Sequence, residues 1–136
     1  MVKPICKDIF FLGRMCKTAD KSDCSIADDL VDTLKANSET CVGMAANMIG
    51  SDKRIIAVND RGRIIVMFNP EIVSCSGAYA TEEGCLSLSG KRPATRYKCI
   101  TVKYQDRTFK TLKSVYLDWT AQIIQHEIDH CNGKVI

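Results

Sequence analysis

The chain has 136 residues and a mass of 15.1 kDa, with 46% hydrophobic and 26% charged residues. A chain of this size forms one ordinary domain, and its composition excludes disordered, collagen-like and low-complexity proteins. Nineteen Lys and Arg against 16 Asp and Glu give a net charge of +3, with no run of basic residues. We therefore expect one globular domain over residues 1–136 and no nucleic-acid partner.

The N-terminal stretch has only a short apolar run at residues 9–12, flanked by charged side chains. This pattern predicts neither a signal peptide nor a membrane span. Eight cysteines are present, but they form no CxxC pair and show no regular spacing. We expect reduced thiols in a cytoplasmic protein, most of them serving as small buried residues.

The first regular element predicted along the chain is an amphipathic helix over residues 22–37, because apolar residues recur there at four-residue spacing. These apolar positions are Ile26, Leu30 and Leu34. Ser25, followed by Asp28 three residues later, resembles a weak capping box. The helix is therefore expected to begin between Asp23 and Ser25.

Short β-branched runs separated by turn-like sequences follow, and they predict antiparallel strands. The expected strands are residues 54–58, 63–68, 71–75, 98–104 and 108–117. Asp60-Arg61-Gly62 suggests a hairpin between the first two strands.

The last segment, residues 118–133, contains no Gly or Pro before Gly133 and predicts a second helix. Asp118 suits its N-cap and Asn132-Gly133 its end. The order helix, strands, helix predicts a single α+β domain, in which antiparallel strands pack around the C-terminal helix and an N-terminal helix adds to the core.

The C-terminal helix carries the only two histidines of the chain, His126 and His130, in the string HEIDH. Side chains four residues apart project from one helix face, as in the HExxH metal-binding arrangement, although the same spacing also arises by chance in structural helices. Glu127 projects beside the histidines, where it can reach a metal-bound water without ligating the metal.

Catalytic zinc-type sites usually have three protein ligands, so one more ligand is needed. The residues after His130 offer no His, Asp or Glu, and Cys131 projects away from both histidines. An upstream carboxylate or thiol must supply it. Cys85 stands out among the thiols because it lies in TEEGCLSLSG, a polar, Gly-containing string that is typical of a loop.

Three strings together resemble the signature motifs of the peptide deformylases. They are GMAANMIG at 43–50, EGCLS at 83–87 and QHEIDH at 125–130, in this order. The resemblance extends over nearly the whole chain and includes NPEI at 69–72.

The resemblance implies a metal-dependent hydrolase that removes the N-formyl group from the initiator methionine of nascent peptides and releases formate. It implies that Cys85, His126 and His130 hold one divalent metal and that Glu127 is the general base and acid. Family members use Fe(II) and accept zinc, nickel or cobalt, so Fe(II) is the ion expected in the cell.

In the family the first motif begins two residues earlier, at the position of Cys41. This chain departs from it at two positions, where Cys41 replaces a Gly and Met48 replaces a Gln. The Gln amide resembles an oxyanion-hole donor that acts with the backbone N–H of the residue corresponding to Leu86. A thioether cannot donate a hydrogen bond, so we expect reduced turnover. Met48 is alternatively a core-packing residue, and Asn47 could replace the donor only after a local rearrangement.

Four residues are expected to form the substrate pocket, although core packing predicts the same pattern. They are Val42, Gly43, Trp119 and Ile123. Arg92, which follows the EGCLS string, resembles a substrate-contacting arginine, with a solvated surface residue as the alternative.

Asp129 is expected to pair with a strand-borne arginine such as Arg96. We expect a monomer, and no stable ribosome partner because the chain ends about six residues after the metal-binding helix. The alternative functions are a deformylase-like metal-binding protein that is inactive on formyl-methionine or acts on another substrate, and a generic HExxH peptidase. The second alternative is weak because it lacks the downstream ligand of such peptidases.

Overall fold

In the computed structural model the described residues are 1–134, so the last two residues of the expected domain lie outside them. The helices are α1 (Ile9–Leu12), α2 (Cys24–Ala36) and α3 (Asp118–Cys131), with 3-10 turns η1 (Lys21–Asp23) and η2 (Ala46–Ile49). The strands are β1 (Gly43–Ala45), β2 (Ile55–Asp60), β3 (Arg63–Cys85), β4 (Leu88–Gln105) and β5 (Thr111–Leu117). None of these helices is long and apolar enough to cross a membrane.

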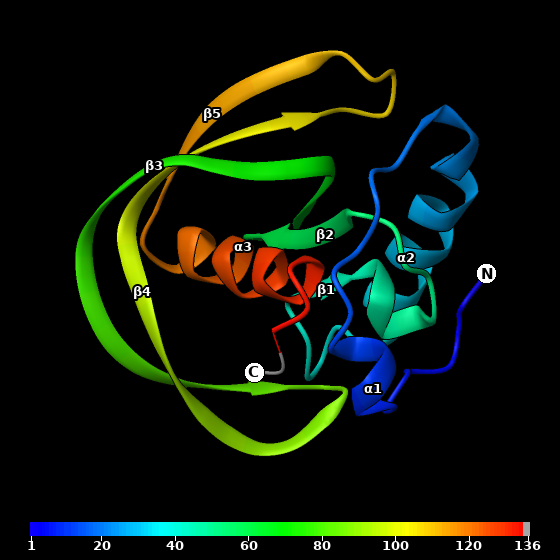
Figure 1. Ribbon diagram of the computed structural model, residues 1–136, viewed down its shortest axis with the longest axis horizontal. Helices are drawn as coiled ribbons and strands as arrows, with labels where there is room; N and C mark the ends of the chain where they lie inside the picture. The colour runs from blue at the N-terminus through cyan, green and yellow to red at the C-terminus, as the bar shows by residue number, and fades with distance from the viewer. Residues whose placement is uncertain (135–136) are drawn as a thin grey trace.

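The strands form one antiparallel sheet in the order β1-β2-β3-β4-β5. The long β3 and β4 bend around α3, while α2 packs beside β1 and β2 on the other side of the molecule (Figure 1). The predicted α+β class is thereby confirmed, with α3 enclosed by the strands.

β2 is buried on both faces and separates two hydrophobic clusters. Ile56 and Val58 point into the cluster with α3, whereas Ile55 and Ala57 point into the cluster with α2. This division follows from the alternation of side chains along a strand. The sheet therefore anchors α3, the helix with both histidines, through an apolar face.

The separate strands expected at 63–68 and 71–75 are wrong, because β3 continues from Arg63 to Cys85. The Asn69-Pro70 pair bends the strand at a register shift and does not end it. Asn69 has a left-handed φ of 53°, and its side chain bonds both backbone groups of Ala19. That anchoring holds the bend.

β4 begins at Leu88, ten residues before the expected 98–104, and β5 begins at Thr111 instead of residue 108. The first half of β4 pairs with β3 in a long hairpin, so strand pairing outweighs its polar and Gly-containing sequence. Residues 106–110 form a turn because the Asp106 carboxylate accepts the backbone N–H groups of Thr108 and Lys110.

α2 begins at Cys24, so the start expected between Asp23 and Ser25 is correct. The N-caps predicted for α2 and α3 are both wrong. The capping box before α2 joins Asp20 and Asp23 instead of Ser25 and Asp28. Leu117 is the N-cap of α3, and Asp118 is its first residue with a φ of 52°. Gly133 ends α3 as predicted, with a φ of 77°.

Candidate active site

Three side chains bring their ligand atoms together where the end of β3 meets α3. Cys85 is the last residue of β3, and His126 and His130 lie one turn apart on α3. The Nε2 atom of His130 lies 3.3 Å from Cys85 Sγ and 3.2 Å from His126 Nε2. All three ligand atoms lie within 4.8 Å of one another. One thiolate and two imidazoles in this arrangement fit a divalent metal ion.

The sequence suggested a loop for Cys85, but it lies in a strand, and this placement explains the neighbouring acidic residue. Glu83 and Cys85 are two positions apart on β3 and therefore share the face that looks onto α3. Glu83 Oε1 lies 2.8 Å from His126 Nδ1. This contact leaves Nε2 of His126 free to bind a metal.

Glu83 is held in turn by a buried arginine, Arg96. The guanidinium of Arg96 donates to both carboxylate oxygens of Glu83 at 2.7–3.1 Å. Its Nη1 donates to Asp129 at 2.6 Å, which confirms the predicted pair of Arg96 and Asp129. Because Arg96 bonds both of its oxygens, the Glu83 carboxylate keeps a fixed position and thereby orients the His126 imidazole.

The charges of the metal-free site are set by these contacts. Burial opposes the charge of Glu83, but hydrogen bonds from His126 and Arg96 outweigh it and lower the pKa of Glu83 to about 2. Burial likewise opposes the His126 imidazolium, yet Glu127, Cys85 and Glu83 raise the pKa of His126 to about 10. Burial and the charge of His126 lower the pKa of His130 to about 3. Metal uptake at neutral pH must therefore release a proton from His126.

Glu127 is 4% exposed, and its Oε1 has no hydrogen-bond partner among the described residues. Burial raises the pKa of Glu127 to about 7, partly offset by the charge of His126. A Cβ atom at Gly43 would lie 2.9 Å from Glu127 Oε2 and 2.6 Å from Ile123 Cγ2. Only glycine leaves room here for the Glu127 carboxylate in its present position.

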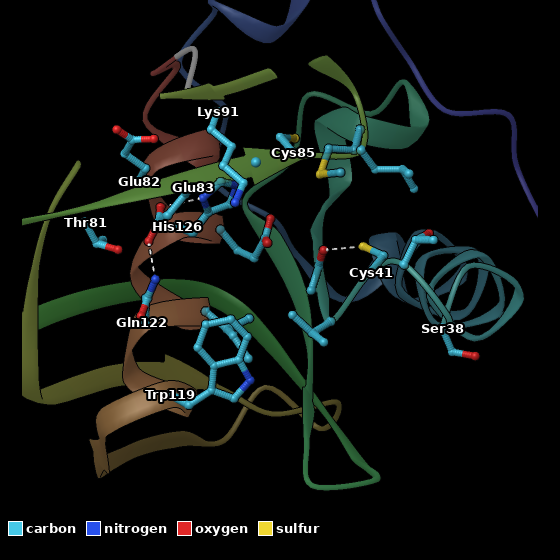
Figure 2. Close-up of a pocket in the computed structure, with 18 of the residues that line it drawn as sticks. Ser38, Cys41, Thr81, Glu82, Glu83, Cys85, Lys91, Trp119, Gln122 and His126 are labelled. Carbon is cyan, nitrogen blue, oxygen red and sulfur yellow. Dashed lines mark hydrogen bonds and ion pairs between the residues drawn. The ribbon is translucent and has the colours of Figure 1, made fainter. Parts of the chain in front are cut away.

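A cavity of about 750 Å³ opens beside these groups, and the four residues expected in the substrate pocket all line it (Figure 2). Val42 and Gly43 come from the β1 side, and Trp119 and Ile123 from α3. Cys85, His126 and Glu127 line the same cavity.

Arg92 is not brought into the cavity. Its Nη1 donates to the carbonyl of Ser89, and its neighbour Lys91 lines the cavity instead. Alternate residues of a strand point to opposite faces, so a one-residue difference decides which of the two basic side chains, Lys91 or Arg92, faces the site.

Met48 lines the cavity and is 1% exposed, so it both packs in the core and faces the site. Its Sδ lies 3.5 Å from the backbone N of Ala45. Leu86, in the turn between β3 and β4, also lines the cavity. Asn47 does not, because its side-chain amide donates to the carbonyl of His130 at 2.9 Å.

Cys41 is buried as expected, and its thiol lies 3.0 Å from the Gly43 carbonyl at the cavity wall. The expectation that most cysteines are buried is wrong, since only Cys16, Cys41 and Cys131 are. All eight are free thiols.

The family model for polypeptide deformylase matches residues 12–136. The peptide deformylase of Clostridium beijerinckii is 52% identical over 136 residues, which is 100% of both chains. The chain belongs to the peptide deformylase family. A second relative, peptide deformylase 3 of Shewanella oneidensis, is 39% identical over an alignment that covers 79% of this chain and 68% of that protein.

Solved deformylase structures match the whole fold. The class I type b peptide deformylase of Acinetobacter baumannii, bound to Met-Ala-Ser, aligns with a TM-score of 0.90 at 28% identity, over 99% of this chain and 97% of that chain. The peptide deformylase of Legionella pneumophila aligns with a TM-score of 0.88 at 34% identity, over 99% of this chain and 83% of that chain. Family membership and the observed donor set agree on a metal-dependent hydrolase.

Three residues that line the cavity were not predicted as site residues from the sequence, namely Glu83, Gln122 and Lys91. Glu83 carried a signal, because a residue two positions before a ligand on a strand shares the ligand's face. Gln122 carried the i−4 spacing from His126 that places it on the same helix face.

Proposed function

We propose that this deformylase removes the formyl group from N-formylmethionine at the start of nascent peptides and releases formate, in the cytoplasm. Its metal is one divalent ion held by Cys85, His126 and His130. Fe(II) is the ion proposed in the cell, with zinc, nickel or cobalt as substitutes, because a mixed thiolate and imidazole donor set accepts all of them. The observation that carries the proposal is the Glu127 Oε1 atom, which has no hydrogen-bond partner in the described part of the chain, together with three converging ligand atoms.

The metal, when bound, lowers the pKa of a water molecule and polarises the formyl carbonyl. Glu127 takes the proton of the attacking water and returns it to the departing methionine amine. In the metal-free site, burial raises the pKa of Glu127 to about 7, which is near the working pH at which a general base is most effective. Gly43 leaves the space that this carboxylate occupies.

The negative charge that develops on the formyl oxygen needs hydrogen-bond donors. We propose that the backbone N–H of Leu86 is one donor, and Met48 supplies none because a thioether only accepts. Loss of one such donor lowers turnover by about 100-fold to 1000-fold. Met48 thus favours a second candidate, a deformylase-like metal-binding protein that is inactive on formyl-methionine or acts on another substrate.

We propose that the methionine side chain enters the cavity beside Val42, Gly43, Trp119 and Ile123. We propose that the working unit is a monomer. Arg92 is left out of the proposed pocket because it does not line the cavity.

Formate release from formyl-Met-Ala-Ser tests the proposal. Protein loaded anaerobically with iron or nickel should release formate, and metal-stripped protein should not. Cys85→Ser should lose both metal and activity, while Glu127→Gln should keep the metal and lose activity. Full metal content in Cys85→Ser, or metal-loaded wild type without formate release, would overturn the proposal.

A further inference from the structure

Gln122 is a polar side chain on the cavity face of α3. It lies between Trp119 and His126 on that face, and all three residues line the cavity (Figure 2). One helical turn, about 5.4 Å along the axis, separates Gln122 from the metal-ligand position at His126. A substrate that reaches the ligand cluster with its formyl group therefore places its first side chain near Gln122.

The amide of Gln122 is held at both ends. Its Nε2 donates to Glu83 Oε2 at 3.0 Å, and its Oε1 accepts the hydroxyl of Tyr79 at 3.1 Å. The Glu83 carboxylate can only accept, so the nitrogen must face it and the amide orientation is fixed. A carboxamide has two N–H donors, and among the described residues only one of those of Gln122 is bonded, so the other remains for a ligand.

The wall of the cavity around Gln122 is polar on one side. Thr81 and Glu83 share the face of β3 that looks onto α3, and both line the cavity. Figure 2 shows Thr81 and Gln122 on the same side of the cavity. Val42 and Ile123 supply apolar surface to the same space. Such a wall suits a mainly apolar side chain that carries one weak hydrogen-bond acceptor.

We propose that Gln122 is a specificity-determining residue, whose free N–H donates to the thioether sulfur of the substrate methionine. The inference rests on the proposed function, because that function places the methionine side chain in this cavity. Norleucine has the same shape but a methylene in place of the sulfur, so it leaves the Gln122 donor unpaired. The protein therefore prefers methionine to norleucine at the first position.

Binding of product peptides measures this preference without requiring catalysis. Calorimetry on the zinc-loaded protein compares Met-Ala-Ser with norleucine-Ala-Ser, in the wild type and in Gln122→Leu. We expect the wild type to bind the methionine peptide about fivefold more tightly, which is the size of one weak hydrogen bond. Gln122→Leu should bring this ratio close to one, mainly by weakening the methionine peptide.

Gln125→Leu is the matched control, because Gln125 lies on the same helix and bonds the backbone of Tyr97 without lining the cavity. It should lower the melting temperature and keep the wild-type ratio. The proposal is overturned if Gln122→Leu keeps the ratio, if Gln125→Leu loses it equally, or if neither peptide binds. Formate release is measured on the same preparations. If the wild type prefers the methionine peptide, Gln122→Leu loses that preference and the wild type releases no formate, the proposed activity is refuted and the role of Gln122 in binding is still supported.

Discussion

Replacing the buried carboxylate by its amide, Glu127→Gln, should stabilise the metal-free protein while it abolishes turnover. Glu127 is 4% exposed and its Oε1 has no hydrogen-bond partner within residues 1–134, so burial makes its charge costly. Its pKa is raised from 4.5 to about 7. The glutamine has nearly the same shape and carries no charge at any pH.

The size of the effect follows from the pKa difference between the folded and unfolded states. Because the folded-state pKa of Glu127 is the higher one, the folded protein retains the proton between pH 4.5 and 7. Its stability falls as the pH rises through this window. Each unit of pKa corresponds to about 1.4 kcal/mol, so the cost is about 1 kcal/mol at pH 5 and about 3 kcal/mol at pH 7.5.

Urea unfolding of metal-stripped wild type and Glu127→Gln at the two pH values measures the free energy of unfolding directly. The variant should be more stable by about 3 kcal/mol at pH 7.5, and this advantage should shrink to about 1 kcal/mol at pH 5. Equal stabilities at pH 7.5, or an advantage that grows as the pH falls, would show that burial does not raise the pKa of this carboxyl.

Two further substitutions test the surroundings of the site. Gly43→Ala should lower turnover by about 100-fold, because its Cβ displaces Glu127 and Ile123, and steady-state kinetics at unchanged metal content would show it. Activity close to wild type would mean that Glu127 moves without consequence. Arg96→Lys keeps the charge but loses the paired hydrogen bonds to Glu83, so zinc affinity measured by chelator competition should fall by about tenfold. An unchanged affinity would assign Arg96 a purely structural role.

The sequence was sufficient for the elements with strong periodicity. α2 follows the predicted apolar spacing, and α3 follows the predicted stretch without Gly or Pro. The two histidines could be placed on one helix face from their separation alone. The long hairpin of β3 and β4 was not predictable in this way, because residues 76–97 contain no long apolar run and their strand structure comes from pairing. Strand pairing is a contact between distant parts of the chain, which local patterns do not encode.

The same limit applies to the site. Cys85 stood out by its polar surroundings, whereas the role of Glu83 depends on a contact with α3 that spans 43 residues of sequence. The exclusion of Arg92 from the cavity depends on the register of β4 against β3. A register shift of one residue would reverse which side chain faces the site.

The central claim is that the metal ligands and Glu127 perform the hydrolysis while Met48 leaves out one donor to the formyl oxygen. Turnover of formyl-Met-Ala-Ser by iron-loaded wild type and Met48→Gln, measured under anaerobic conditions, tests it most directly. The variant should gain about 100-fold in kcat with a much smaller change in KM, because the added hydrogen bond strengthens mainly in the transition state. Equal kcat values, with both proteins fully loaded with metal, would contradict the account.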